Sequence, residues 1–442
     1  MNVKENTSLT FGHLDMKKNF LLLICIGLSI VSFDGKAQGT KCATMNILER
    51  RMLQDPSLRQ HMEESETQTQ KLISTNPYLK RTAQVITIPV VVHVIWNDPI
   101  QNVSDEQIQS QLDVLNQDFR FLNADTLNSS HPFRGQAADS RIEFCLATRD
   151  PNGELTTGIT RTQTSVVGWD PNDADNIKST ANGGKDNWNP TQYLNMYVVK
   201  LDSLTLGFAT FPEELTTSPN LDGVVIRYEV FGTKGTAGTG NFESNTGGRT
   251  GTHEVGHWLN LRHIWGDDEC GDDFVSDTEK AEAANYDCPT FPHKASNKCG
   301  TGNNGEMYMN YMDYVDDKCM NMFTIGQSER MTAALTGPRS GLLTSQGCQT
   351  PLSVEHNEIA NDINVYPNPN NGMFTIHMSE ASSKDVTIKV QNVFGNVVKE
   401  ISTNSNARIQ VNAVNEFQPG TYFIRIDSGD NSIITKKILI NK

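Results

Sequence analysis

The sequence predicts two folded units, a mixed α/β (α+β) domain followed by a small all-β sandwich. Residues 81–350 begin with a β-branched run and then alternate apolar and amphipathic stretches, which is typical of strands and helices in one domain. Residues 363–442 contain short alternating runs separated by Asn, Gly and Ser turns. Between these units, residues 351–362 are polar and form a predicted linker.

The N-terminal segment is predicted to be an export signal. An apolar run at residues 20–31 follows two lysines and is too short to span a bilayer. Residues 35–37, Gly-Lys-Ala, have the small-x-small form that a signal peptidase cuts after, so residues 1–37 are expected to be a signal peptide. Lipidation of Cys25 is the alternative, which the bulky residue before it disfavours.

The overall composition suits an exported protein. The 442 residues are 37% hydrophobic and carry a formal net charge of -15, which argues against a nucleic-acid partner or an anionic membrane surface. Beyond the signal peptide the sequence contains no long apolar run, so we expect no transmembrane helix in the mature form. We also expect a monomer. The charge by itself is explained equally well by an ordinary solvated surface.

Residues 38–80 are polar, with weak helical patterning and no obvious core of their own. A linker would have this composition, but between a signal peptide and a folded domain a propeptide is the better interpretation. The α/β unit then begins near Arg81. Within it we expect strands at residues 85–96, 141–147, 193–200 and 224–228, and amphipathic helices at 105–122, capped by Ser104, and at 324–335.

The stretch THEVGHWLNLRH, residues 252–263, has the spacing of a metal site. His253 and His257 are four residues apart, so on an α-helix both imidazoles lie within about 40° on one face. His263 reaches the same ion only if the helix stops, and Asn260 tolerates the left-handed conformation that such a turn needs. Three nitrogen ligands with an open fourth position describe a catalytic zinc site.

Glu254 lies beside the first of these histidines and can point into the same cleft. There it would take a proton from the attacking water and pass it to a leaving amine. The simpler alternative is that two histidines flank a turn of a core helix by chance. The third histidine at the fitting distance argues against that alternative.

Residues 253–267, HEVGHWLNLRHIWGD, resemble the extended zinc motif of the metzincins, and specifically of their pappalysin family. Metzincins normally carry Gly where this chain has Asn260. The resemblance implies a metzincin-like fold for residues 81–350, a catalytic Zn²⁺ and activity as an endopeptidase on proteins or peptides. The alternative is a catalytically silent surface adhesin of the same fold, although all three histidines and Glu254 are intact.

Residues 308–325, YMNYMDYVDDKCMNMFTI, resemble the pappalysin version of the methionine turn that lies beneath the zinc. The resemblance implies that Met312 is the apolar floor and that Tyr314 points its phenol at the metal or the oxyanion. Asp317 matches an acidic residue at the base of the pocket for the side chain after the scissile bond. A buried carboxylate there would prefer arginine and then lysine, whereas a solvated loop aspartate is the alternative. Lys80-Arg81 is then a self-processing point.

The cysteines suggest both a switch and disulfides. A thiolate from Cys42 would be a fourth zinc ligand and keep the proenzyme latent, and Lys41-Cys42-Ala43-Thr44 resembles pappalysin prosegments; an incidental thiol is the alternative. The other cysteines of the exported part predict disulfides, for which six cysteines permit fifteen connectivities. The resemblance implies Cys270 with Cys299 and Cys288 with Cys319, leaving Cys145 and Cys348 as a candidate third pair.

Carboxylates are crowded in residues 266–278, GDDECGDDFVSDT. Oxygen-rich loops suit calcium, and pappalysin-like enzymes bind Ca²⁺ near this place, so Asp273 and Asp277 are candidate ligands. A solvated acidic surface is the alternative.

In residues 363–442, alternating runs predict an antiparallel sandwich with strands at 373–377, 386–390, 397–401, 421–426 and 433–440. Val365-Tyr366-Pro367-Asn368-Pro369, Gly372 and the terminal lysine-containing strand resemble the C-terminal sorting domain of the Bacteroidetes type IX secretion system. That resemblance implies the secretion machinery as a partner and a location outside a Gram-negative cell, released or on its surface. An adhesive or carbohydrate-binding module is the alternative.

Overall fold

The computed structural model describes residues 41–75, 84–349, 363–378, 385–393, 395–404, 408–427 and 433–441. The predicted signal peptide, the Lys80-Arg81 processing point and the linker at 351–362 lie outside these ranges. Of the helices in the described ranges, none combines the length and the hydrophobicity that a bilayer crossing requires.

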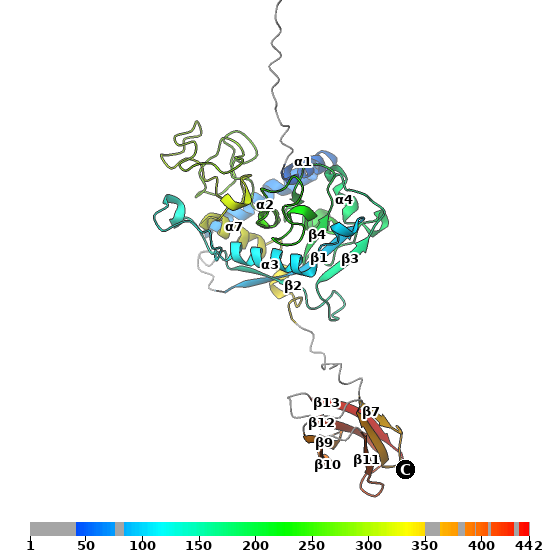
Figure 1. Ribbon diagram of the computed structural model, residues 1–442. Helices are drawn as coiled ribbons and strands as arrows, with labels where there is room; N and C mark the ends of the chain where they lie inside the picture. Colours follow the sequence, from blue (N-terminus) through cyan, green and yellow to red (C-terminus); the bar gives the residue numbers. More distant parts are fainter. Residues whose placement is uncertain are drawn as a thin grey trace, which may run out of the picture.

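A largely parallel sheet organises the α/β domain (Figure 1). Its strand order is β2-β1-β4-β6-β5, and β3 pairs with β1 beyond the end of β2. Only β5 runs antiparallel, at the edge of the sheet. The strand bounds are β1 Ile86–Trp96, β2 Ile142–Leu146, β3 Ile159–Gln163, β4 Leu194–Val199, β5 Gly207–Ala209 and β6 Val224–Arg227.

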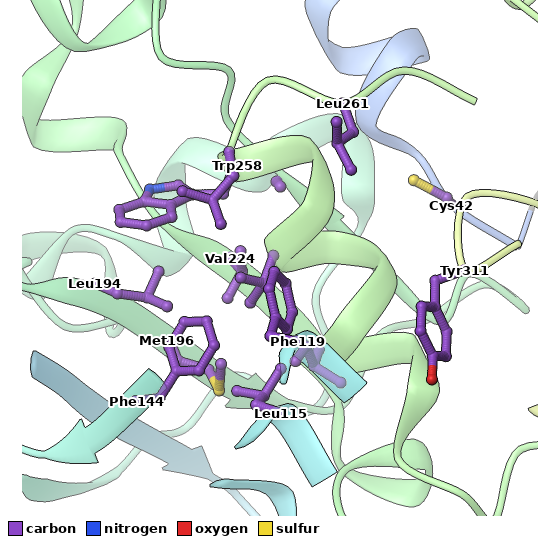
Figure 2. Close-up of a cluster of buried hydrophobic side chains, with 14 of the residues drawn as sticks. Cys42, Leu115, Phe119, Phe144, Leu194, Met196, Val224, Trp258, Leu261 and Tyr311 are labelled. Atoms are coloured by element: carbon purple, nitrogen blue, oxygen red, sulfur yellow. The ribbon is translucent and has the colours of Figure 1, made fainter. Parts of the chain in front are cut away.

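Helices α3 (Asp105–Phe119) and α6 (Arg249–Trp258) cover one face of this sheet. Figure 2 shows Leu115 and Phe119 of α3 meeting strand residues Leu194, Met196 and Val224 beneath α6. The opposite face packs against α4 (Ala174–Ile177) and the start of α1. Burying both faces explains why β1 reads as a continuous apolar run instead of an alternating one.

Three local features of the α/β domain depart from the sequence prediction. Ser104 caps α3 as predicted, its side chain accepting from the Gln107 amide at 3.2 Å, but the helix ends at Phe119 and not at 122. Phe121 has a φ of +53°, which no α-helix accommodates, and Leu122 is 69% exposed. Strands β3 and β5 were not predicted, because β3 (ITRTQ) has a single apolar residue and no fully buried position, and β5 has only three residues.

The predicted prosegment forms two helices, α1 (Thr44–Gln54) and α2 (Pro56–Thr75). It lacks a core of its own because its apolar residues pack on the α/β domain: Leu48, Leu58 and Met62 surround the buried ring of Phe211. In Figure 1 these blue helices lie across the upper part of the domain.

Short elements complete the α/β domain, namely α5 (Glu214–Thr217) and 3-10 turns η1 Pro99–Gln101, η2 Pro132–Gly135, η3 Pro171–Asp173, η4 Thr180–Asn182, η5 Pro219–Leu221, η6 Tyr228–Val230, η7 Asp317–Cys319 and η8 Ser340–Thr344.

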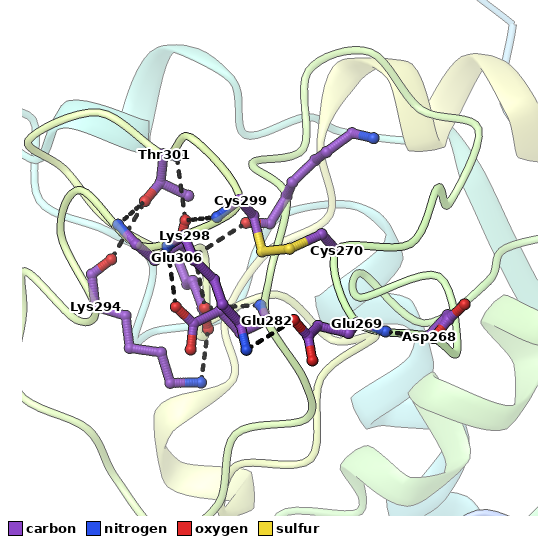
Figure 3. The surroundings of a disulfide bond; sticks show 11 residues. Asp268, Glu269, Cys270, Glu282, Lys294, Lys298, Cys299, Thr301 and Glu306 are labelled. Atoms are coloured by element: carbon purple, nitrogen blue, oxygen red, sulfur yellow. Dashed lines mark hydrogen bonds and ion pairs between the residues drawn. A yellow bond between two sulfur atoms is a disulfide. The ribbon is translucent and has the colours of Figure 1, made fainter.

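Between α6 and η7 the described chain has no helix or strand, and cross-links hold it instead. Cys270 pairs with Cys299 and Cys288 with Cys319, as the resemblance implies, while Cys145 pairs with Cys348. Around the first of these bonds, Lys298 pairs with Glu269 at 2.9 Å and buried Glu306 accepts from Lys294 at 3.2 Å (Figure 3). Helix α7 (Ile325–Thr336), capped by Thr324, closes the domain.

The C-terminal module is a sandwich of two antiparallel sheets, β10-β9-β12-β13 and β11-β8-β7. Both sheets contribute to one apolar core that includes Phe374, Ile388, Ile424 and Phe417. This confirms the all-β prediction, with β7 and β11 as additional strands. The bounds are β7 Ile363–Tyr366, β8 Met373–Met378, β9 Asp385–Asn392, β10 Val397–Asn404, β11 Arg408–Asn412, β12 Gly420–Asp427 and β13 Ile433–Ile440.

Candidate active site

Three histidine side chains converge at one point beside α6. The Nε2 atoms of His253, His257 and His263 lie 3.1 to 3.3 Å from one another. A tetrahedral ion with metal–nitrogen distances of about 2.0–2.1 Å would place such nitrogens about 3.3 Å apart, so the spacing fits one metal. The Cys42 sulfur joins the same donor group, all four atoms lying within 4.8 Å of one another.

Asn260 makes the turn that brings His263 back. Its φ is +74°, the left-handed conformation that the sequence predicts there. Arg330 of α7 fixes this turn from outside, because its Nε donates to the Asn260 carbonyl at 2.5 Å and its guanidinium also reaches the Asn260 side-chain oxygen at 3.1 Å. Metzincins normally carry glycine at this position. Here the residue is an asparagine, and Arg330 holds its side chain.

Each histidine is oriented through its second ring nitrogen. The Nδ1 of His253 contacts the Tyr311 carbonyl at 2.7 Å, and that of His257 contacts the Leu261 carbonyl at 2.8 Å. The Nδ1 of His263 contacts the Asp267 carboxylate at 2.5 Å. Since carbonyl oxygens can only accept, His253 and His257 carry the proton on Nδ1 and present a lone pair at Nε2, as a metal ligand requires.

Glu254 faces the same space from α6. Its Oε2 accepts from the Thr44 hydroxyl at 3.1 Å and from the Cys42 thiol at 3.4 Å, whereas its Oε1 is buried without a partner. Burial raises the pKa of Glu254 to about 8, although the two hydrogen bonds oppose the shift. A Cβ on Gly207 would lie 2.9 Å from the Glu254 side chain, so only glycine gives β5 this close approach.

Met312 and Tyr314 both lie next to the histidine-bearing helix α6. Met312 is fully buried against α6, and a Cβ on Gly256 would approach its sulfur to 2.5 Å, so the glycine of the HEVGH motif admits this floor. The Tyr314 ring stands against His253 and His263, with centroids 5.7 and 4.9 Å apart. Its hydroxyl donates to the Cys42 carbonyl at 3.3 Å.

Asp317 is buried, 2% exposed, so the solvated-loop alternative is wrong. Its carboxylate accepts from the backbone amides of Gly247 at 2.9 Å and Arg249 at 3.2 Å, and from the Asn245 side chain at 3.2 Å. It therefore caps the N-terminus of the metal-binding helix, where a negative charge is favoured. It also lines the small cavity that reaches Glu254.

The candidate calcium ligands lie away from the histidines and not together. Asp273 accepts from the Val275 amide at 3.1 Å and from the Thr278 hydroxyl, and it lines a surface cavity of about 600 Å³. Asp277 accepts from the Thr324 hydroxyl at 2.7 Å and the Gly326 amide at 2.9 Å, so it stabilises the start of α7. In the part of the chain that the structure describes, neither aspartate belongs to a group of three or more His, Cys, Asp or Glu side chains placed closely enough to hold a metal ion.

Several contributing residues were not predicted. Asp267 follows His263 by four residues, and a carboxylate near a ligand histidine is a signal that would have identified it. The Thr44 hydroxyl links Glu254 to β5, because it donates to the Glu254 carboxylate and accepts from the Ala209 amide at 2.9 Å. Asp118 of α3 accepts from the Tyr311 hydroxyl at 2.8 Å, and no local pattern pairs residues so distant in sequence.

A metal-ligand set built on one helix, with a glutamate beside it and an N-terminal thiol over it, defines a latent metallopeptidase of the metzincin class. Comparison with known proteins agrees. Residues 178–336 match the family described as Pregnancy-associated plasma protein-A. Residues 364–441 match the secretion system C-terminal sorting domain.

Solved structures of mirolysin from Tannerella forsythia resemble the chain closely. Mature mirolysin in complex with a cleaved peptide is 46% identical, with a TM-score of 0.58, over 61% of this chain and 100% of that one. A promirolysin mutant is 44% identical, with a TM-score of 0.62, over 69% and 97%. The extracellular metalloprotease of Arthroderma otae is 30% identical over 263 residues, 58% of this chain and 80% of the relative.

The chain belongs to the pappalysin family. It is a zinc metalloendopeptidase made as a zymogen, and its sorting domain directs it outside the cell by type IX secretion. This sets aside the alternative of a catalytically silent adhesin.

Proposed function

We propose that this enzyme cuts proteins and peptides before arginine, and less readily before lysine, after a prosegment covering residues 38–80 is removed. The active domain is then residues 81–350, and residues 363–442 serve secretion. The observation that carries this proposal is the convergence of three imidazole Nε2 atoms within 3.3 Å of one another, with Glu254 beside them and the prosegment sulfur among them.

His253, His257 and His263 would hold the zinc, which when bound acidifies water and polarises a peptide carbonyl. Glu254, freed of its contacts with Thr44 and Cys42, takes the proton of the attacking water and delivers it to the leaving nitrogen. Tyr314 loses its Cys42 acceptor at the same time, so its hydroxyl is available to the oxyanion.

Strand β5 offers a place for an extended substrate. It lies at the sheet edge, where the prosegment now pairs with it: the Leu206 amide donates to the Lys41 carbonyl at 2.7 Å and the Ala43 amide to the Gly207 carbonyl at 3.0 Å. Removal of the prosegment exposes this hydrogen-bonding edge, which any peptide backbone can use. The cleaved peptide named with mature mirolysin supports a peptide substrate here.

The preference for a basic residue is supported by the charges around the cavity beside Glu254. Asp313 and Asp317 line it. Asp317 is partly neutralised by the amides at the start of α6, so we propose that it acts together with its neighbours and not by itself. Arginine is favoured over lysine because its side chain is longer and its guanidinium binds a carboxylate through two N–H groups.

Mass-spectrometric mapping of cut sites in a denatured protein mixture tests this specificity. The activated full chain should enrich arginine, then lysine, directly after the cut, and its own mature N-terminus should be Arg81. Parallel digestion with a zinc chelator present identifies cuts that do not come from the metal site. Zinc-dependent cuts with no enrichment of basic residues would contradict the pocket assignment while leaving the peptidase in place.

We propose Ca²⁺ as a structural ion near Asp273. This carboxylate is 5% exposed, and burial raises its pKa to about 7, because the hydrogen bonds from Thr278 and Val275 and the charge of Arg330 only partly offset the desolvation. A bound Ca²⁺ would offset the remainder. A calcium-selective chelator should then lower the melting temperature by about 5 °C, since a ligand lost from the folded state removes its binding free energy.

Asp273→Asn is the matched variant for this measurement, because it should melt lower and respond less to the chelator. Excess Ca²⁺ should restore the melting temperature of the unmutated protein. If the unmutated protein melts at the same temperature with and without the chelator, the calcium proposal is wrong.

A further inference from the structure

An arginine of the catalytic domain binds a carboxylate in the second helix of the prosegment. Glu66 of α2 accepts from the Nη1 and Nη2 atoms of Arg330 in α7, at 2.8 and 2.5 Å. Burial opposes ionisation of Glu66, but the hydrogen bonds and the charge of Arg330 lower its pKa, so the carboxylate is held in its charged form. Two N–H groups on one carboxylate are the arrangement by which arginine selects this group.

A second arginine lies next to this ion pair and is less well satisfied. The Arg262 guanidinium lies 5.6 Å from the centroid of the Phe211 ring and 5.3 Å from that of Phe274, a ring that Arg330 also approaches at 5.7 Å. The Arg262 Nε is buried without a hydrogen-bond partner, and among the described residues this side chain forms no ion pair. Burial and the charge of Arg330 lower the pKa of Arg262, so an added anion would stabilise both guanidinium groups.

Departure of the prosegment leaves these two arginines short of negative charge. Besides Glu66, the carboxylates that attract Arg262 are Glu213 and Asp267. Asp267 is engaged with the Nδ1 of His263 at 2.5 Å. That leaves Glu213 to balance two guanidinium groups, so the uncovered surface is cationic as well as aromatic.

This surface lies on the other side of the metal ligands from the Asp317 cavity. The described prosegment begins at Lys41, whose Nζ donates to the Tyr314 carbonyl at 2.8 Å and which lines that cavity. The chain then places its thiol among the histidines and continues to Leu48, which packs against Phe211. A substrate with the residue after its scissile bond at Asp317 therefore directs the residues before that bond toward Phe211.

We propose that Phe211, Arg262, Phe274 and Arg330 form a second recognition site, which binds a glutamate or aspartate side chain among the substrate residues before the scissile bond. The proposal rests on the proposed function, which places the residue after that bond at Asp317. Glu66 fills the site in the proenzyme, so a substrate reaches it only when α2 has left. The two ends of the cleft then select opposite charges.

Hydrolysis of paired peptides by the activated full chain tests the proposal. All peptides carry arginine after the cut, and the two members of a pair differ by glutamate or glutamine at one position before it, scanned along the sequence. At the best position glutamate should lower KM about tenfold relative to glutamine, with kcat little changed, because a charge-assisted hydrogen bond adds binding that does not depend on the reaction step. Added salt should weaken this preference.

Arg262→Gln should make the two members of each pair nearly equal in KM, because it removes the arginine that is free of other ion pairs. Zinc content measured on the same preparations shows whether the neighbouring ligand His263 is disturbed. The matched control is Lys234→Gln, which neutralises an exposed cation of the same domain and should keep the preference for glutamate.

Equal KM values for glutamate and glutamine at every position would overturn the proposal, and this comparison uses only the unmutated enzyme. A preference for glutamate that survives in Arg262→Gln would overturn it as well. A second peptide set, with lysine or glutamine in place of the arginine after the cut, measures the basic preference separately. Failure of the acidic site and failure of the proposed function are therefore distinguishable.

Discussion

Alanine in place of Cys42 should give the uncleaved chain peptidase activity about 100-fold above that of the unmutated proenzyme, which corresponds to about 2.7 kcal/mol of lost blocking interaction. The thiol lies in the donor group with the three histidines and contacts Glu254 at 3.4 Å. Its removal opens the fourth metal position and removes one of the two hydrogen bonds to Glu254. The measurement is hydrolysis of a small peptide by zinc-loaded proenzyme before any processing is visible on a gel.

Two variants serve as controls for the Cys42 experiment. Cys42→Ser should behave like the alanine variant, because a neutral hydroxyl is a poor zinc ligand. The Cys42→Ala, Glu254→Ala double variant should be inactive, which excludes a contaminating protease. If Cys42→Ala retains its zinc and remains as latent as the unmutated chain, helices α1 and α2 block the cleft without help from the thiol.

Glutamine in place of Glu254 should lower kcat/KM of the activated enzyme by about 10²- to 10⁴-fold, the usual contribution of a positioned general base. Zinc content should not change, because Glu254 contributes no atom to the histidine and cysteine donor group. The replacement has the same shape and keeps an oxygen acceptor for the Thr44 hydroxyl in the proenzyme. The experiment compares peptide hydrolysis and bound zinc in the same preparations.

Glu154→Gln is the matched control, since Glu154 is an exposed loop residue of the same domain. It should have normal activity. Near-normal activity of Glu254→Gln, with zinc bound, would assign proton transfer to another group. Loss of zinc along with activity would instead show that the variant disturbs α6.

Patterns that repeat over short distances determined much of this protein from its sequence. The four-residue spacing of His253 and His257 places both on one helical face, and the left-handed turn at Asn260 follows from the need to return to the metal. The apolar run of β1, the Ser104 cap of α3 and the alternating C-terminal runs are local in the same sense. Such features follow from how side chains repeat along a single helix or strand, which neighbouring residues in the sequence decide.

Tertiary structure alone decided which distant groups meet at the site. Cys42 and Glu254 are 212 residues apart, and Lys41 and Tyr314 are 273 apart, so no spacing rule relates them. The cap that Asp317 forms on α6 and the three-residue edge strand β5 likewise depend on neighbours from other segments. Their positions depend on how distant segments pack into one apolar core and form hydrogen bonds to one another's buried polar groups. No single segment of the sequence determines that arrangement.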